Sequence, residues 1–141
     1  EIEERIEMSQ LLIAKEILAN NYDAWLSWEC DQIIPLDALD RLVKLQEMGN
    51  FMIVMHNSLV RFDNNHSNFG WGLTLVTREC LEKYASLLPW VSRADYATIP
   101  NNRKLSDESA FAHRVLQQGG NYIKIDGIIK PIYHLDNGEY L

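Results

Sequence analysis

The order of elements along this chain predicts an α/β fold, with a mostly parallel central sheet flanked by helices and a C-terminal β-hairpin. Helix-like and strand-like stretches alternate up to residue 55, an order typical of parallel α/β sheets. Residues 51–55, FMIVM, form a continuous apolar run, as expected of a strand covered on both faces. Asp126-Gly127 lies between two apolar stretches and indicates a hairpin turn. The 141 residues are enough for one domain with a real core, so we expect residues 1–141 to form a single domain.

The first half of the chain predicts two helix–strand pairs. Residues 1–19 place apolar side chains at helical spacing, with acids in the first turn, and residues 24–28 are typical of a buried strand. Pro35 suits the first position of a second helix, which we expect to end near Gly49. A helix that leads directly into a strand is the second half of a βαβ unit, so we expect a further strand to precede Glu1.

The second half alternates less regularly. We expect a polar loop or edge hairpin over residues 56–68, then a glycine-containing turn followed by a strand over 69–77. A helix over 78–87 and a long loop over 89–105 should follow. The chain then continues with a capped helix over 106–118, ended by two glycines, and two strands over 121–134. His56 and His66 in the first of these segments are candidate metal ligands, although a histidine in a polar loop is more often solvated.

Composition excludes several classes of function. The net charge of −7 and the absence of a basic run argue against nucleic-acid binding. No apolar stretch approaches the ~20 residues that cross a bilayer. The acidic opening EIEER does not resemble a signal peptide, so we do not expect one. Two cysteines make no disulfide framework, so we expect reduced thiols in a cytoplasmic protein, with peripheral membrane association as a second option. We expect Cys30 to be an apolar filler that points into the fold.

Two acids at the end of the first strand are the principal candidate site. Glu29 and Asp31 are separated by one residue, so in an extended backbone both side chains project to the same side. Open α/β sheets bind ligands beyond the carboxyl ends of their strands, where this pair would lie. Two carboxylates there can share Mg²⁺ or Mn²⁺, which in turn can hold a diphosphate. The alternative is an ordinary turn, in which Asp31 caps the next helix and Glu29 is solvated.

Two tryptophans are candidates for stacking on a sugar or a base. Trp71 lies between two glycines, which permit a close approach of the backbone or a positive φ, so we expect it to contact a ligand. Trp28 alternates with apolar positions of its strand, so we expect it in the core.

Three segments, taken in order, resemble nucleotide-sugar glycosyltransferases of the GT-A fold, in a family-2-like form. YDAWLSWECDQIIPLDALDRLV is similar to the stretch in which a strand ends in D-x-D and runs into a helix, with Glu29 in place of the first Asp. FGWGLTLVTRECLEKY resembles the acceptor-side segment, and SDESAFAHRVLQQGG resembles the "E-D-x-D-F-x-x-R-x-x-x-x-G" helix. In the last segment the acidic pair is inverted to Asp107-Glu108, and Ala110 replaces another acid. The first part of the family's donor-binding half would precede Glu1.

The resemblance implies metal-dependent transfer of a sugar from a nucleoside-diphosphate sugar to a hydroxyl of a glycan, lipid-linked or protein acceptor. It implies a third metal ligand late in the chain, for which we choose His134. A strand histidine bonded to backbone is an equal alternative. Glu108 takes the position of the catalytic base, supported by Asp107, although both acids could simply cap a helix. Arg114 could pair with these acids or with the diphosphate, or form a surface ion pair.

Two other interpretations remain open. The first is an inactive remnant of the same fold that serves as a binding or scaffold module. The second is a different metal-dependent enzyme acting on phosphate esters. Retention of the two strand-end acids, Glu108 and His134 favours the transferase, whereas the missing front portion favours the binding module.

Overall fold

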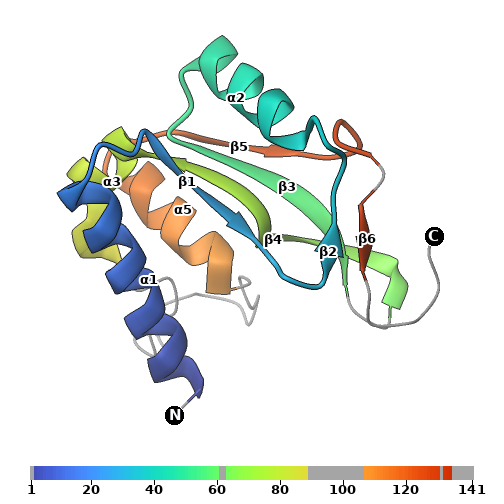
Figure 1. Cartoon of the computed structure of the whole chain (residues 1–141), viewed down its shortest axis with the longest axis horizontal. Coiled ribbons are helices and arrows are strands. Elements are labelled where there is room, and N and C mark those ends of the chain that lie inside the picture. The colour runs from blue at the N-terminus through green and yellow to red at the C-terminus, as the bar shows by residue number, and fades with distance from the viewer. Residues whose placement is uncertain (1, 61–62, 89–106, 131, 135–141) are drawn as a thin grey trace.

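A computed structural model describes residues 2–60, 63–88, 107–130 and 132–134 of the chain (Figure 1). Within them the chain forms an α/β fold, with helices on both faces of a mixed four-stranded sheet. The elements are α1 (Ile2–Ala19), β1 (Ala24–Trp28), β2 (Gln32–Ile33), α2 (Ala38–Gly49), β3 (Ile53–Val60), β4 (Asp63–Thr77), α3 (Arg78–Tyr84), the 3-10 helix η1 (Ala85–Leu87), α5 (Asp107–Gln117), β5 (Tyr122–Ile125) and β6 (Tyr133–His134). Among these residues, no helix combines the length and apolar character that spanning a bilayer requires.

The main sheet has the order β1-β4-β3-β5 and is mixed, so the prediction of a mostly parallel sheet is wrong. β4 runs antiparallel to both β1 and β3, whereas β3 and β5 are parallel. The apolar pattern identified the strands but carries no information about their direction. Only two residues separate β3 from β4, a connection that permits an antiparallel pair but is far too short for a parallel one.

A second sheet contains β2 and β6, paired antiparallel with Gln32 opposite His134 and Ile33 opposite Tyr133. The predicted C-terminal hairpin is therefore wrong, because β5 pairs with β3 and β6 pairs with β2. Gly127 does adopt a positive φ of 71°, as a glycine turn would. That turn redirects the chain to a different sheet, since a local turn signal does not determine which strand the chain pairs with next.

The core is divided between the two faces of the sheet. Alternate residues of β3 serve opposite faces, with Ile53 and Met55 on one and Val54 on the other. The first face packs against α1, α3 and α5, and Phe111 is fully buried there. The second face packs against α2, chiefly through Leu42. Each face thus has its own apolar cluster, joined through the backbone of the sheet.

Most helix boundaries follow the predicted ones. α1 and the pair α3–η1 match the expected helices, and Gly119, with a φ of 90°, follows the end of α5. Pro35 is the exception, because α2 begins at Ala38. The backbone N–H of Ala38 donates to the Pro35 carbonyl, so this proline lies in a turn ahead of the helix.

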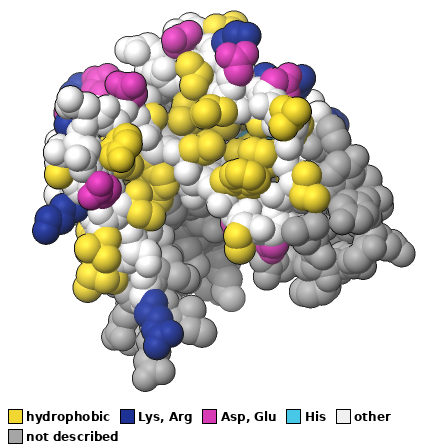
Figure 2. All heavy atoms as spheres, viewed as in Figure 1, with side chains coloured by type: hydrophobic (Ala, Val, Ile, Leu, Met, Phe, Trp, Pro, Cys, Tyr) yellow, Lys and Arg dark blue, Asp and Glu magenta, His cyan; other side chains and the backbone are white. Residues whose placement is uncertain are grey.

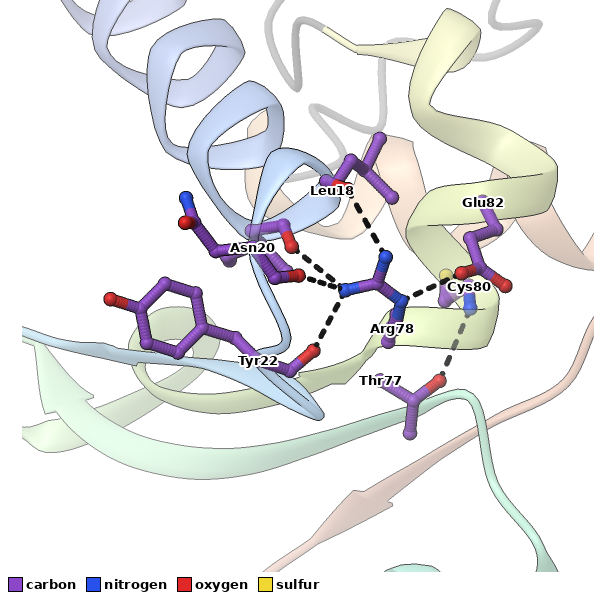
Figure 3. A network of polar contacts seen from close by, with 8 residues as sticks. Leu18, Asn20, Tyr22, Thr77, Arg78, Cys80 and Glu82 are labelled. Carbon is purple, nitrogen blue, oxygen red and sulfur yellow. Dashed lines mark hydrogen bonds and ion pairs between the residues drawn. The ribbon is translucent and has the colours of Figure 1, made fainter.

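Arg78, the first residue of α3, fixes the end of α1 against the start of β1 (Figure 3). Its guanidinium donates to four backbone carbonyls and to the Glu82 carboxylate. The four carbonyls are those of Ile17, Leu18, Asn20 and Tyr22. A helix leaves its last carbonyls without partners inside the helix, and α1 has no basic residue in its own last turn. Arg78 supplies those donors from another element and so holds the connection that leads into β1.

Candidate functional site

The carboxyl ends of three strands lie at one edge of the main sheet. β1, β3 and β5 all run in the same direction, because β4 is antiparallel to its neighbours and β3 is parallel to β5. α5 leads through two glycines directly into β5, so the helix runs back along the sheet and begins near this same edge (Figure 1). The end of β1 and the start of α5 thus lie at one edge, the usual place for ligands in open α/β sheets.

A tight turn closes the end of β1. The Glu29 backbone N–H donates to the Gly72 carbonyl at 3.0 Å, which extends the pairing of β1 with β4 by one residue. The Gln32 backbone N–H then donates to the Glu29 carbonyl at 3.1 Å. The Trp28 indole Nε1–H donates to the Gln32 carbonyl at 2.9 Å. These three bonds fix the path of the chain past both predicted acids.

Gly72 provides the space in which the turn packs. A Cβ atom at this position would lie 2.4 Å from Gln32 Nε2 and 3.2 Å from Glu29 Oε2. The side chains of Glu29 and Gln32 therefore lie directly against the β4 backbone. Alternation places position 72 on the same face of the sheet as Val76, which packs in the cluster with α5. Gly72 thus leaves space for two side chains of the same protein, whereas the expected approach of a ligand beside Trp71 stays a prediction. Glu29 lies on the α5 face of the sheet.

A large irregularity in the β3–β4 ladder accompanies this approach. Met55 pairs with Thr74 and Asn57 pairs with Phe69, so two steps along β3 correspond to five steps along β4. The extra residues of β4 include Trp71, which lies in the strand and not in the separate turn that we expected. Bulges of this kind re-aim side chains and are frequent beside active sites. The side chain of Trp71 lies outside the described part of the structure.

The structure places the backbone of the three proposed metal ligands close together. Glu29 and Asp31 belong to the turn after β1 and not to an extended strand, so the expectation that alternation directs both side chains to the same side does not apply. His134 pairs with Gln32, the residue that follows Asp31. Glu29 is exposed and Asp31 is half-buried. Their carboxylates are oxygen donors of the type that Mg²⁺ and Mn²⁺ prefer, so the two acids fit such an ion. No group of three or more metal-ligating side chains occurs among the described residues, which do not include the His134 imidazole.

The acids of α5 are placed by its backbone. Asp107 and Glu108 form the start of the helix, and their side chains lie outside the described residues. Arg114 lies in the last turn and is half-buried. At 1.5 Å of rise per residue it lies about 9 Å along the helix axis from Glu108. The structure therefore brings the two acids, and not Arg114, to the carboxyl edge of the sheet.

Three expectations for neighbouring residues are wrong. Cys30 is exposed, because it lies in the turn, where strand alternation no longer applies. Trp28 is 52% exposed, because it is the last residue of β1, which lies at one end of the strand order. His56 is only 3% exposed, because β3 continues past residue 55 and pairs His56 with Ile125. His66 falls in β4, and its side chain lies outside the described residues.

Gln32 is the residue of this site that the sequence analysis did not identify. It is 2% exposed and its side-chain Nε2–H donates to Glu29 Oε2 at 3.0 Å. The only signal in the sequence is a glutamine placed three residues after the first acid, ahead of two isoleucines, and this signal is weak. Comparison of the chain with models of protein families, with curated proteins and with solved structures gives no match.

Proposed function

We propose that the chain is a metal-dependent glycosyltransferase that moves a sugar from a nucleoside-diphosphate sugar to an acceptor hydroxyl. The observation that carries this proposal is the arrangement at the carboxyl edge of the sheet. Two carboxylates follow β1, the backbone of His134 pairs beside them, and α5 begins at the same edge with Asp107 and Glu108. The combination agrees with the order of segments by which the sequence resembles GT-A glycosyltransferases, so we extend the α/β fold to that type.

On the donor side, Glu29, Asp31 and His134 would hold Mn²⁺ or Mg²⁺ at the end of β1. The bound ion would offset the negative charge that builds up on the departing diphosphate. An imidazole ligand would favour Mn²⁺ over Mg²⁺. The turn that carries the two acids is fixed by a backbone bond from Glu29 to Gly72, a backbone bond from Gln32 to Glu29, and the Trp28 indole. It can therefore keep its shape as the donor binds and departs, a requirement for preorganised charge stabilisation.

On the acceptor side, Glu108 would remove the proton from the acceptor hydroxyl, with Asp107 supporting it or binding sugar hydroxyls. Trp71, in the irregular part of β4, would stack on the sugar or the base. The acceptor would be a glycan, a lipid-linked sugar or a protein. The two free cysteines suit the reducing cytoplasm, where nucleotide sugars are available to such an enzyme.

The decisive experiment measures release of nucleoside diphosphate from a panel of nucleotide sugars, with and without Mn²⁺ or Mg²⁺. We expect stimulation by the metal, and loss of the activity in Asp31→Asn. Asp40→Asn is the matched control, because Asp40 is an exposed acid that pairs with Lys44 on the outside of α2. Equal activity in wild type and a folded Asp31→Asn variant would remove the assigned metal site.

A binding or scaffold module is the second candidate, and one observation favours it. Large hydrophobic side chains are exposed on the face that carries β1, β2 and α2 (Figure 2). They include Trp28, Ile33, Leu36, Leu39 and Val43. Several large apolar side chains exposed together on one face are typical of protein contact sites. A folded protein that releases no diphosphate from any nucleotide sugar, with either metal, would favour this second candidate.

A further inference from the structure

Gln32 is fixed in the turn after β1 through both its backbone and its pairing in β2. Its backbone N–H donates to the Glu29 carbonyl and its carbonyl accepts from the Trp28 indole. Its position in β2 pairs it with His134 of β6. Only 2% of the residue is exposed, although glutamine is usually found at the surface. A buried amide is costly unless its polar atoms are used, so the side chain is expected to have a specific partner.

That partner is the Glu29 carboxylate. Gln32 Nε2 lies 3.0 Å from Glu29 Oε2, and only the NH₂ end of the amide can donate to a carboxylate. The contact depends on Gly72, because a Cβ atom there would lie 2.4 Å from Gln32 Nε2. The same Cβ atom would lie 3.2 Å from Glu29 Oε2, so an alanine at 72 would displace the far ends of both side chains.

We infer that Gln32 is a positioning residue, which orients the Glu29 carboxylate for a divalent cation. The inference rests on the proposed function, in which Glu29 is a metal ligand. Hydrogen bonds from neighbouring residues orient metal-binding side chains, and their loss typically weakens metal affinity 10- to 100-fold. A neutral amide suits this task, because it fixes a carboxylate oxygen and leaves the negative charge for the cation. A lysine or arginine in the same place would compete with the metal for that charge.

The test measures the dissociation constant for Mn²⁺ alone, from the electron paramagnetic resonance signal of the free ion. Gln32→Met removes the donor at similar volume. We expect it to weaken Mn²⁺ binding about 10-fold, the lower end of the range for such partners. Gln10→Met is the matched control, because Gln10 is also a buried glutamine but lies on α1. We expect it to leave the affinity for Mn²⁺ unchanged.

A double variant separates positioning from a general structural role. If Gln32 acts through Glu29, Gln32→Met has no further effect once Glu29→Ala has removed the carboxylate. An equal loss of affinity in both backgrounds would overturn the inference, as would a Gln32→Met protein that binds Mn²⁺ like Gln10→Met. In both of these cases a loss of affinity in Glu29→Ala would leave the proposed metal site standing. Unchanged affinity in Glu29→Ala would instead refute the metal site and the role of Gln32 together.

Discussion

The two cysteine side chains have opposite environments, although both are free thiols. Cys80 is fully buried in the cluster between α3 and α5, whereas Cys30 is exposed in the turn after β1. Burial, with a smaller contribution from the Glu79 charge, raises the pKa of the Cys80 thiol from 9.0 to about 12. A thiol reacts as its thiolate, so Cys80 is protected both by lack of access and by lack of ionisation.

This contrast predicts the outcome of thiol labelling. With an aromatic disulfide reagent near neutral pH we expect the folded protein to release one equivalent of chromophore, from Cys30. A second equivalent should appear only after unfolding in guanidinium chloride. Cys30→Ser should abolish the first equivalent and retain the second. Two rapidly reacting thiols in the folded protein would contradict the burial of Cys80.

The raised pKa of Cys80 also predicts how stability depends on pH. Between pH 9.0 and about 12 the unfolded chain loses the thiol proton and the folded chain keeps it. The unfolded state then binds fewer protons, so the free energy of unfolding falls as pH rises, by at most about 1.4 kcal/mol per unit from this group. Below pH 9.0 the thiol is protonated in both states and has no such effect.

Urea unfolding at several pH values above and below pH 9.0 checks this prediction. Other groups also titrate in the alkaline range, so the informative quantity is the difference in unfolding free energy between wild type and Cys80→Ala. We expect wild type to lose stability relative to Cys80→Ala as the pH rises. A difference that stays constant for Cys80→Ala would show that the buried thiol ionises as readily as an exposed one.

At this scale the sequence predicted the carboxylates but not their environment. The spacing of Glu29 and Asp31 after an apolar strand was sufficient to place both at the strand end. Nothing in the local pattern shows that Gly72, more than forty residues away in the sequence, leaves space for Glu29 and Gln32. A contact between a turn and a distant backbone depends on strand pairing, which local periodicity does not specify.

Arg78 shows how one side chain joins separate elements. Its guanidinium binds carbonyls at the end of α1 and in the connection to β1 (Figure 3). We expect Arg78→Met to lower the free energy of unfolding by about 2–4 kcal/mol, because several carbonyls lose a charged donor at once. Arg78→Lys should recover little of it, since an ammonium group cannot reproduce the planar fork of donors. Urea unfolding followed by circular dichroism measures both changes.

Lys83→Met is the control for this effect, because Lys83 lies on the same helix and pairs with the exposed Glu79. Loss of an exposed pair at this spacing is worth about 0.5 kcal/mol or less. An Arg78→Met variant as stable as Lys83→Met would show that water replaces the guanidinium at the end of α1.

The helices were the easier elements to predict. The left-handed Asn50 and Gly119 that follow α2 and α5, and the Thr77 cap of α3, are local features. The Thr77 hydroxyl accepts from the Cys80 backbone N–H at 3.2 Å. The buried side of α1 differs from its apolar pattern, because Leu11, Leu12 and Ile13 are exposed whereas Gln10, Ala14 and Ile17 are buried. Strand partners were harder, since β4 inserts between β1 and β3 and β6 pairs with β2. The pairing of the strands depends on how residues distant in the sequence pack on both faces of the sheet, so no single stretch of sequence predicts it.

At the scale of the whole molecule, the apolar core and the candidate site occupy different parts of the sheet. The two apolar clusters fill its faces, and the polar residues of the candidate site gather where β1, β3 and β5 end. Gln32 and His134 join this edge through a second, two-stranded sheet. A site assembled from β1, β4, β6 and α5 requires the complete fold, so fragments of the chain are not expected to bind a metal.

This arrangement divides the proposed reaction between two places, which single variants can distinguish. Glu108 lies in the first turn of α5 and would act on the acceptor, whereas Asp31 follows β1 and would bind the metal. We therefore expect Glu108→Gln to lower kcat for transfer by about 10²- to 10⁴-fold, the usual contribution of a general base, and to leave Mn²⁺ affinity unchanged. Asp31→Asn should lower both. Steady-state kinetics and Mn²⁺ titration on the same preparations measure the two quantities.

Glu79→Gln is the matched control for Glu108→Gln, because Glu79 is also an acid in the first turn of a helix. Loss of a first-turn charge costs about 0.3–1 kcal/mol of stability and should leave transfer unchanged. If Glu108 only caps α5, Glu108→Gln will behave like Glu79→Gln, with a small loss of stability and normal kcat. If Glu108 is the base, the fall in kcat will far exceed any change in stability. The ratio of these two effects therefore decides between the two roles of the acid at the start of α5.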